Sequence, residues 1–348
     1  MRITKDKCDI TMEPVDGGGF KIEIFPQDPD VFLAKRECVT AYPVELIELI
    51  LKIKGPYGLC DEILRDEKPE YVQASLKYDL LSYVDTPAFE GKRILDFGCG
   101  SGASTAILGR MFPDSRIVGL ELNAPLLEIA QARAAHYQLS RVTFHRSADP
   151  TSLPEDLGEF DFVLLSAVFE HLLPQERQTL FPKLWSLVKP GGVMFINQTP
   201  YRYFPVETHT TGLPLINYLP DGMAHRIAKR FSKRNLEKAG WPELLRGGIR
   251  GSSAREIMSI LKHNGQNAVL LKPAYLGIKD PVDLWHVKID RSKYPALKEL
   301  YAVLARLLYY CGITLLPHVS VAIKKETGLT VAGQSVQRIT APSPPDRR

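Results

Sequence analysis

The pattern of apolar and polar positions changes along the chain. Before residue 89, GFKIEIF alternates as a strand does, and residues 43–54 (PVELIELILKIK) repeat their apolar positions with a period of about 3.6 residues, as a helix does. From Lys92 onward, helical stretches separate five short apolar runs: RILDF, SRIVGLEL, RVTFHRS, FDFVLLS and VMFINQT. Alternation of strand and helix is typical of a parallel, doubly wound sheet. The sequence therefore predicts an α/β protein with a Rossmann-like core.

The rest of the chain predicts how this core is completed. Residues 200–251 contain many prolines, aromatics and cations without a clear period, which indicates an insertion over the sheet. SSAREIMSILKHNG predicts a helix that is capped by Ser252 or Ser253 and stopped by Gly265. NAVLLKP and HVSVAIKK would then be the last two strands of a seven-stranded sheet. The predicted division is an N-terminal extension (1–88), a core (89–199), an insertion (200–255), a C-terminal completion of the sheet (256–330) and a disordered, proline-rich tail (331–348).

Composition narrows the class of protein. A hydrophobic content of 45% is ordinary for a globular chain, and a net charge of +4 is too small to indicate a nucleic-acid partner. Five scattered cysteines without a C-x-x-C pair predict reduced thiols. The start of the sequence lacks the apolar core of a secretory signal, so we expect a cytoplasmic location.

Two segments bear on membrane contact. The longest apolar stretch, from Leu300, is interrupted by Arg306, Gly312 and Pro317, which favours a buried helix followed by a strand over a membrane span. Residues 225–238 hold six Lys or Arg against the single acid Glu237. We expect a solvated helix face there, and a surface for an anionic substrate or for peripheral membrane contact is the alternative.

A glycine-rich turn follows the first strand of the core. In open α/β sheets, ligands bind beyond the carboxyl ends of the strands, and Gly98, Gly100 and Gly102 fall at that point. A dinucleotide site would show nearly the same string. However, the carboxylate of Asp96 would repel a pyrophosphate and suits a cationic ligand, and Glu121 closes the second strand, where an acid accepts hydrogen bonds from ribose. A ribose and a positive charge without phosphate describe S-adenosylmethionine.

With these pieces in order, residues 92 to about 200 resemble the core of a class I S-adenosylmethionine-dependent methyltransferase. The matching motifs are LDFGCGSG, GLELN, SADPTSLP, FDFVLLSAVFEHL and LVKPGGVMFI. The resemblance implies that S-adenosylmethionine is the cofactor and assigns a part of it to each position. Its methionine part would lie at Asp96, Gly98 and Gly100, its ribose at Glu121, its adenine at Leu122, Ala148 and Asp149, and its reacting methyl near Ser166. Gly102, the last glycine of the turn, is also expected to contribute to the cofactor site, and a role only in helix packing is the alternative.

Candidate catalytic residues follow the fourth and fifth strands. His171 lies in FEHL, where we expect a structural role at a helix start rather than catalysis. Glu207 and His209 flank Thr208 just past the fifth strand, and two such residues point the same way in an extended chain. They would be a base and its orienting partner, two ligands of a metal, or parts of a hydrogen-bonded loop. The sequence by itself assigns no metal ligand.

The resemblance and these residues predict methyl transfer to a hydroxyl of a small-molecule acceptor, such as a sugar or another secondary metabolite. Oxygen is preferred because the fourth strand is not followed by an N-P-P-Y type motif, which would indicate amine methylation of nucleic acid or protein. N- or C-methylation is the alternative within the family. A nicotinamide-dependent oxidoreductase and a non-catalytic cofactor-binding module are the alternatives outside it. The sequence does not determine the oligomeric state.

Overall fold

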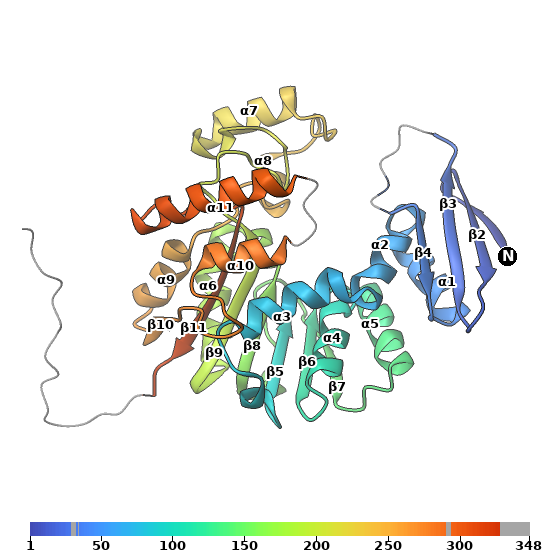
Figure 1. Ribbon diagram of the computed structural model, residues 1–348, viewed down its shortest axis with the longest axis horizontal. Helices are drawn as coiled ribbons and strands as arrows, with labels where there is room; N and C mark the ends of the chain where they lie inside the picture. The colour runs from blue at the N-terminus through green and yellow to red at the C-terminus, as the bar shows by residue number, and fades with distance from the viewer. Residues whose placement is uncertain (29–32, 34, 290–293, 328–348) are drawn as a thin grey trace, which may run out of the picture.

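The computed structural model of the protein describes residues 1–28, 33, 35–289 and 294–327, so the predicted tail at 331–348 lies outside the described residues. A seven-stranded sheet forms the centre of the molecule, and a separate four-stranded antiparallel sheet lies near the N-terminus (Figure 1).

The central sheet has the predicted doubly wound topology. Its strand order is β10-β11-β9-β8-β5-β6-β7, with β11 antiparallel to β9 and β10 antiparallel to β11. The other strands are parallel, so the predicted seven-stranded, Rossmann-like fold is confirmed. The strands are β5 (Arg93–Phe97), β6 (Arg116–Glu121), β7 (Val142–Arg146), β8 (Phe160–Ser166), β9 (Val188–Pro200), β10 (Ala268–Leu270) and β11 (His318–Lys325).

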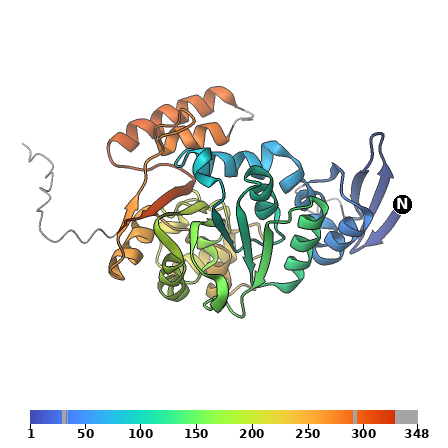
Figure 2. The same ribbon diagram turned by 90° about the horizontal axis from the view of Figure 1, so that it is seen from below.

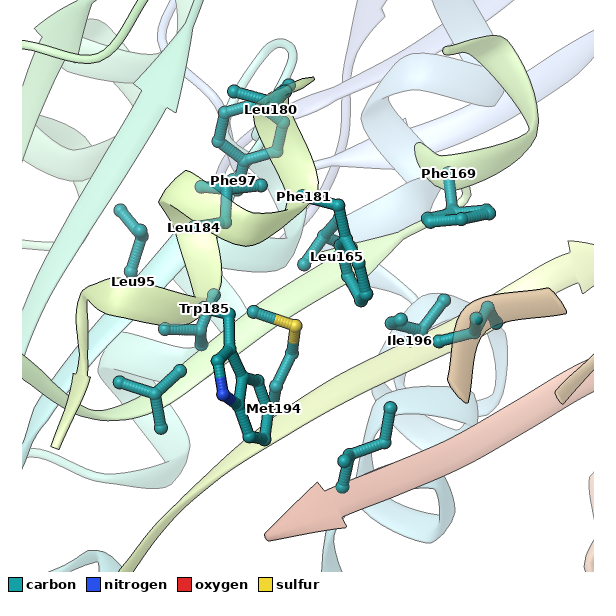
Figure 3. Packing of buried hydrophobic residues seen from close by; sticks show 14 of the residues in the cluster. Leu95, Phe97, Leu165, Phe169, Leu180, Phe181, Leu184, Trp185, Met194 and Ile196 are labelled. Carbon is teal, nitrogen blue, oxygen red and sulfur yellow. The ribbon is translucent and has the colours of Figure 1, made fainter. Parts of the chain in front are cut away.

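Helices cover both faces of this sheet because the strand residues alternate between two apolar clusters. One cluster packs against α6 (Pro174–Ser186) and α9 (Ala254–His263); there Phe181 and Trp185 of α6 lie over Leu165 and Met194 (Figure 3). The other cluster packs against α3 (Ala74–Leu81), α4 (Ala103–Met111) and α10 (Pro281–Lys288). The predicted cap of α9 is confirmed, since the Ser253 side chain accepts a hydrogen bond from the Glu256 amide.

The N-terminal region has its own core, which joins the rest of the molecule through α5 (Ala124–His136). It consists of β1 (Arg2–Lys5), β2 (Cys8–Pro14), β3 (Phe20–Pro26), β4 (Glu37–Thr40), α1 (Val44–Lys54) and α2 (Pro56–Glu67). The buried side chains of this sheet and these helices form one cluster with Ile129 of α5. A π-helix, η1 (Pro69–Gln73), leads to α3, and a short 3-10 turn, η2 (Thr86–Phe89), leads to β5.

The insertion after β9 also has a small core of its own. It contains η5 (Ile216–Tyr218), α7 (Asp221–Phe231) and α8 (Trp241–Arg246), which pack around Ile216, Ala224, Leu244 and Ile249. Two further 3-10 turns flank β8: η3 (Glu155–Leu157) precedes it and η4 (Phe169–His171) follows it.

The buried helix predicted near Leu300 is wrong in one respect. This segment forms α11 (Pro295–Tyr310), which lies beside α10 in both views (Figures 1 and 2) and buries only Ala302 and Ala305. Its larger apolar side chains point outward, with Leu300 66% and Leu307 61% exposed. The helix therefore packs through its small residues. No helix of the described residues has the length and apolar character that a membrane crossing requires.

Candidate active site

The strand order reverses at β5, which has β6 on one side and β8 on the other. A crevice for a ligand opens at such a point, beyond the carboxyl ends of the strands. Gly98 begins the turn after β5 with φ +70°, and its amide and that of Cys99 both donate to the Leu120 carbonyl, at 2.8 and 3.0 Å. A Cβ on Gly98 would lie 2.7 Å from a methyl of Val168. Glycine therefore lets the turn approach the loop that follows β8.

Glu121 lies against this turn, as expected for an acid that serves the same ligand. One of its carboxylate oxygens accepts a hydrogen bond from the Gly100 amide at 2.9 Å, and the other accepts from the amides of Leu122 and Asn123. The oxygen that accepts from Gly100 keeps a lone pair for a ribose hydroxyl. Gly100 has φ +56°, and a Cβ there would meet no atom within 4 Å, so the turn faces open space. The side chain of Leu122, which is 39% exposed, lies at the same strand end.

Two other residues of the motif have roles behind the turn. Gly102 precedes α4 with φ +78°, and a Cβ there would lie 2.6 Å from that of Ala130 on α5, which supports the helix-packing alternative. Asp96 is 1% exposed and accepts hydrogen bonds from the hydroxyls of Ser104 and Thr105, at 2.7 and 2.6 Å. Burial raises the pKa of this carboxyl. Asp96 thereby anchors the start of α4 beneath the turn.

Ala148 and Asp149 are exposed just beyond β7, which pairs with β6 up to Glu121. They therefore lie on the same edge of the sheet as the glycine turn. The Asp149 carboxylate accepts hydrogen bonds from the amide and hydroxyl of Thr151, both at 2.8 Å, and these bonds lower its pKa to about 2. The Asp149 carboxylate thus holds its own loop.

A cavity of about 380 Å³ lies at the carboxyl ends of β8 and β9. Ser166 ends β8, and the next residue, Ala167, has φ +53°; Gln198 on β9 has φ +58°. A positive φ is strained for residues other than glycine, and such strain gathers at functional sites. Both residues line the cavity, and the remaining lining residues are Ser75, His209, Pro281, Leu284, Trp285, Lys288, Ile289, Leu316, Pro317, His318 and Ser320.

His209 presents its ring to this cavity, but Glu207 does not. The ring of His209 makes no hydrogen bond to any residue that the structure describes, and its desolvation lowers its pKa, with His171 and Arg234 adding to the effect. The Glu207 carboxylate is buried and accepts from the amides of His209, Thr210 and Thr211 and from the Thr211 hydroxyl. The segment is a turn rather than an extended chain, so the pairing of Glu207 with the His209 ring is wrong, and Glu207 holds the loop instead.

His171 lies closer to His209 than the sequence indicated. Its ring centroid is 5.3 Å from that of His209, and its Nδ1 is 2.6 Å from the carbonyl oxygen of Arg246 on α8. The turn η4 brings these two histidines from different segments to one place.

Residues 94–192 match the family model described as "Methyltransferase domain". The match begins in β5 and includes the glycine turn, Glu121 and the end of β8. Residues 94–192 therefore form a methyltransferase domain of the class I, S-adenosylmethionine-dependent type. The match sets aside the nicotinamide-dependent oxidoreductase as an alternative.

Curated relatives match this chain over part of their length. The chain is 36% identical over 102 residues to a trans-aconitate 2-methyltransferase of Methylobacterium radiotolerans, covering 29% of this chain and 36% of that protein. It is 32% identical over 172 residues to a ubiquinone biosynthesis O-methyltransferase of Brucella anthropi, covering 47% of this chain and 61% of that protein. The chain therefore spans between about a third and three fifths of the length of these relatives.

Among solved structures, the YcgJ protein of Bacillus subtilis has a TM-score of 0.42 and 14% identity, with 74% of this chain and 100% of that chain covered. PKMT2 of Rickettsia typhi, in complex with AdoHcy, has a TM-score of 0.44 and 15% identity, with 73% of this chain and 52% of that chain covered.

The candidate site contains residues that the motifs did not indicate. His318 and Lys288 line the cavity, and Glu170 lies beside both histidines. Only His318 had a usable signal, because HVSVAIKK was expected beside the fifth strand and His318 is its first residue.

The basic segment, residues 225–238, is also more than a solvated face. Most of its cations are exposed as expected, but Arg234 donates hydrogen bonds to the carbonyls of His209 and Thr208, at 2.6 and 2.9 Å. The expectation of a purely solvated segment is therefore wrong at Arg234, because the chain turns back after α7 and brings this guanidinium to the His209 loop.

Proposed function

We propose that this protein binds S-adenosylmethionine in the crevice beside the glycine turn and transfers its methyl group to a hydroxyl oxygen of a small molecule held in the adjacent cavity. The observation that carries the proposal is the position of this cavity. Ala167, directly after the strand end expected nearest the reacting methyl, lines its wall. A donor in the crevice and an acceptor in the cavity would therefore meet at the end of β8.

The residues present fit this cofactor. Gly98 and Gly100 leave the turn free of side chains, and the Glu121 carboxylate lies 2.9 Å from the Gly100 amide with acceptor capacity to spare. When bound, the cofactor would supply an electrophilic methyl group on a sulfonium. The contribution of the protein is to align the acceptor oxygen with that carbon and to exclude water.

The acceptor oxygen must also lose its proton. His209 and His318 bring two imidazoles into the cavity, and the pKa of each is lowered, that of His318 to about 4, mainly by desolvation. Both rings are therefore neutral at pH 7 and present a nitrogen that can accept a hydrogen bond or a proton. General bases of this kind contribute about 10²- to 10⁴-fold to a rate.

The cavity wall fits a small acceptor with both apolar and polar groups, such as a secondary metabolite or a sugar. Leu284, Trp285 and Leu316 supply the apolar part and Gln198 a polar part. Lys288 also lines the cavity, but it is paired with both oxygens of Asp79 at 2.7 Å. Transfer to oxygen, rather than to nitrogen or carbon, is supported by a curated relative that is named an O-methyltransferase.

The proposal is tested with S-adenosylmethionine that carries a deuterated methyl group. The purified protein is incubated with this cofactor and a small-molecule extract, and labelled products are identified by mass spectrometry. We expect a labelled ether or ester from the wild-type protein, and a yield reduced about 10²- to 10⁴-fold for His209→Ala. Binding of the cofactor without any labelled product would favour the non-catalytic binding module, and label on nitrogen or carbon would correct the acceptor atom.

A further inference from the structure

We propose that Glu170, His171 and His209 bind one divalent transition-metal ion, such as Zn²⁺, at the edge of the acceptor cavity. A carboxylate oxygen and one ring nitrogen from each histidine lie within 4.8 Å of one another. Metal binding is inferred from the positions of these three side chains and does not depend on the proposed function. The use of the metal in activating the acceptor does rest on the proposed function.

The carboxylate of Glu170 is the strongest sign of a missing cation. Its side chain is fully buried, and one oxygen accepts a hydrogen bond from the Thr199 hydroxyl at 2.9 Å. The other oxygen has no hydrogen-bond partner among the described residues and lies 3.9 Å from Nε2 of His171. A buried, unpaired carboxylate oxygen is costly, and burial accordingly raises the pKa of Glu170. A bound cation would remove this cost.

Both histidines present a nitrogen that is suited to a metal. Nδ1 of His171 donates to the Arg246 carbonyl at 2.6 Å, which leaves the lone pair of Nε2 directed toward Glu170. Metal-binding histidines commonly make this kind of bond to a backbone carbonyl through their other nitrogen. One ring nitrogen of His209 lies within 4.8 Å of the donor atoms of Glu170 and His171. Thr199 and Arg246 thus orient two of the three ligands.

Gly248 makes the close approach of these residues possible. It has φ +88° and lies against the cluster: a Cβ there would be 2.7 Å from Cδ2 of His209 and 3.2 Å from Cγ of Glu170. Any other residue would push His209 away from Glu170 at this place. The segment after α8 is therefore shaped to bring an imidazole from one loop against a carboxylate from another.

The donor set determines the class of metal. Two imidazoles and one carboxylate suit Zn²⁺ and its neighbours in the first transition row, whereas Mg²⁺ and Ca²⁺ prefer oxygen ligands. Bonds of about 2.0–2.2 Å place ligand atoms on one ion roughly 3–4 Å apart, so the most distant pair, which lies within 4.8 Å, would close by at most about 1–2 Å. His209 lines the cavity, and the open coordination position would face the acceptor.

A metal there would activate the acceptor in the proposed reaction, and His209 would then serve as its ligand rather than as a base. An oxygen bound to Zn²⁺ loses its proton near neutral pH. The proton of the acceptor hydroxyl would pass to water in the cavity, and the electron pair of the O–H bond would stay on oxygen. The oxygen would then form the new bond to the methyl carbon while the electron pair of the old C–S bond leaves with sulfur.

The test measures metal binding directly, on protein without a histidine tag that has been stripped with a chelator. Titration calorimetry with Zn²⁺ should show one ion per chain for the wild-type protein. Glu170→Gln and His209→Ala should weaken binding by at least about 10- to 100-fold. His318→Gln is the matched control, because His318 lines the same cavity outside the cluster, and it should bind Zn²⁺ as the wild type does.

Loss of Zn²⁺ binding is separated from loss of folding by the stability of the variant, and from failure of the proposed function by a second ligand. Glu170→Gln keeps an acceptor for Thr199 and removes an unpaired buried charge, so the metal-free variant should melt no lower than the wild type. Binding of S-adenosylhomocysteine is measured on the same samples. A protein that binds Zn²⁺ but not this nucleoside keeps the metal site and contradicts the proposed function. Absence of Zn²⁺ binding by the wild type, or equal affinities in Glu170→Gln, His209→Ala and His318→Gln, would overturn the metal site.

Discussion

His318 lines the cavity together with His209 and Lys288, and the residue is exposed on the cavity side. Partial desolvation of the ring, together with the charges of Lys288 and His209, lowers its pKa to about 4, although Asp79 opposes the shift. In the unfolded chain the ring would have its ordinary pKa of about 6.5. The unfolded state therefore binds the proton first. The stability that the neutral ring contributes is complete above about pH 6.5 and is lost as the pH falls toward 4.

This pH dependence of stability is tested with His318→Gln, whose side chain cannot titrate. We expect the difference in melting temperature between wild type and variant to be constant above pH 7. As the pH falls from 6.5 to 4, the wild type should lose stability relative to the variant. Parallel melting curves over that range would contradict the lowered pKa.

For single residues, the sequence predicted some positions and partners and not others. Glu121 was predictable, because the register of parallel strands determines that the end of β6 lies beside the turn after β5. Glu207 was not, because the choice between the His209 ring and three backbone amides depends on the turn geometry of residues 207–211. Glu170 was missed because its partner Thr199 lies on another strand, 29 residues away.

An exposed guanidinium helps the Glu207 carboxylate to hold the loop that carries His209. Arg234 donates to the carbonyls of Thr208 and His209, so Arg234→Gln should release this loop. A displacement of about 1 Å near the chemistry can lower a rate about 100-fold. We expect lower turnover, or a higher KM for the acceptor, with unchanged affinity for S-adenosylhomocysteine.

Arg230→Gln is the matched control for this experiment. Its guanidinium lies 5.6 Å from the centre of the neighbouring Phe231 ring, whereas the hydrogen bonds to the His209 loop come from Arg234. The steady-state kinetics of Arg234→Gln should therefore differ from those of Arg230→Gln. Equal kinetics of the two variants would show that Arg234 is only part of a solvated surface, as the sequence predicted.

The position of a helix could be predicted where its one apolar face packs on the sheet, as for α9, whose cap at Ser253 was expected. The buried face could not be predicted where a helix packs beside the sheet. The leucines of α11 indicated burial, but the helix contacts α10 through Ala302 and Ala305, because small residues allow close packing. Apolar content alone does not determine which side of a helix is covered.

At the scale of the whole molecule, Arg133 connects the N-terminal region to the cofactor crevice. The fully buried guanidinium lies 3.0 Å from a Glu62 oxygen and 3.1 Å from an Asp66 oxygen, and it donates to the Ser101 carbonyl in the glycine turn. Glu62 also accepts from the Ser101 hydroxyl, and the Arg133 charge is the main factor that lowers its pKa, to about 2, against the effect of burial. The N-terminal region therefore holds the turn from behind.

Arg133→Ala would remove the fully buried cation that two buried carboxylates share, and would leave only the more distant Lys54, 3.4 Å from Glu62, and Arg110, 4.0 Å from Asp66. We expect it to lower the free energy of unfolding by about 3–5 kcal/mol in urea denaturation. Arg2→Ala removes an ion pair whose guanidinium is 71% exposed, and it should change stability by less than about 0.5 kcal/mol. A small effect of Arg133→Ala would show that the two regions fold independently of this network.

The order of the central sheet followed from the alternation of strands and helices, whereas the arrangement of the N-terminal sheet did not. Its four strands are short, and their pairing depends on contacts of α1, α2 and α5 that no local pattern contains. The position of this region behind Ser101 was therefore visible only in three dimensions.

The central claim is that the crevice at Gly100 and Glu121 binds S-adenosylmethionine, and its most direct test is the melting temperature with S-adenosylhomocysteine. A ligand at 100 times its Kd stabilises by about 2.7 kcal/mol, which is readily measured. We expect a clear rise for the wild type, a smaller one for Glu121→Gln, and none with NAD. A rise with NAD alone, or none with S-adenosylhomocysteine at any concentration, would contradict the account.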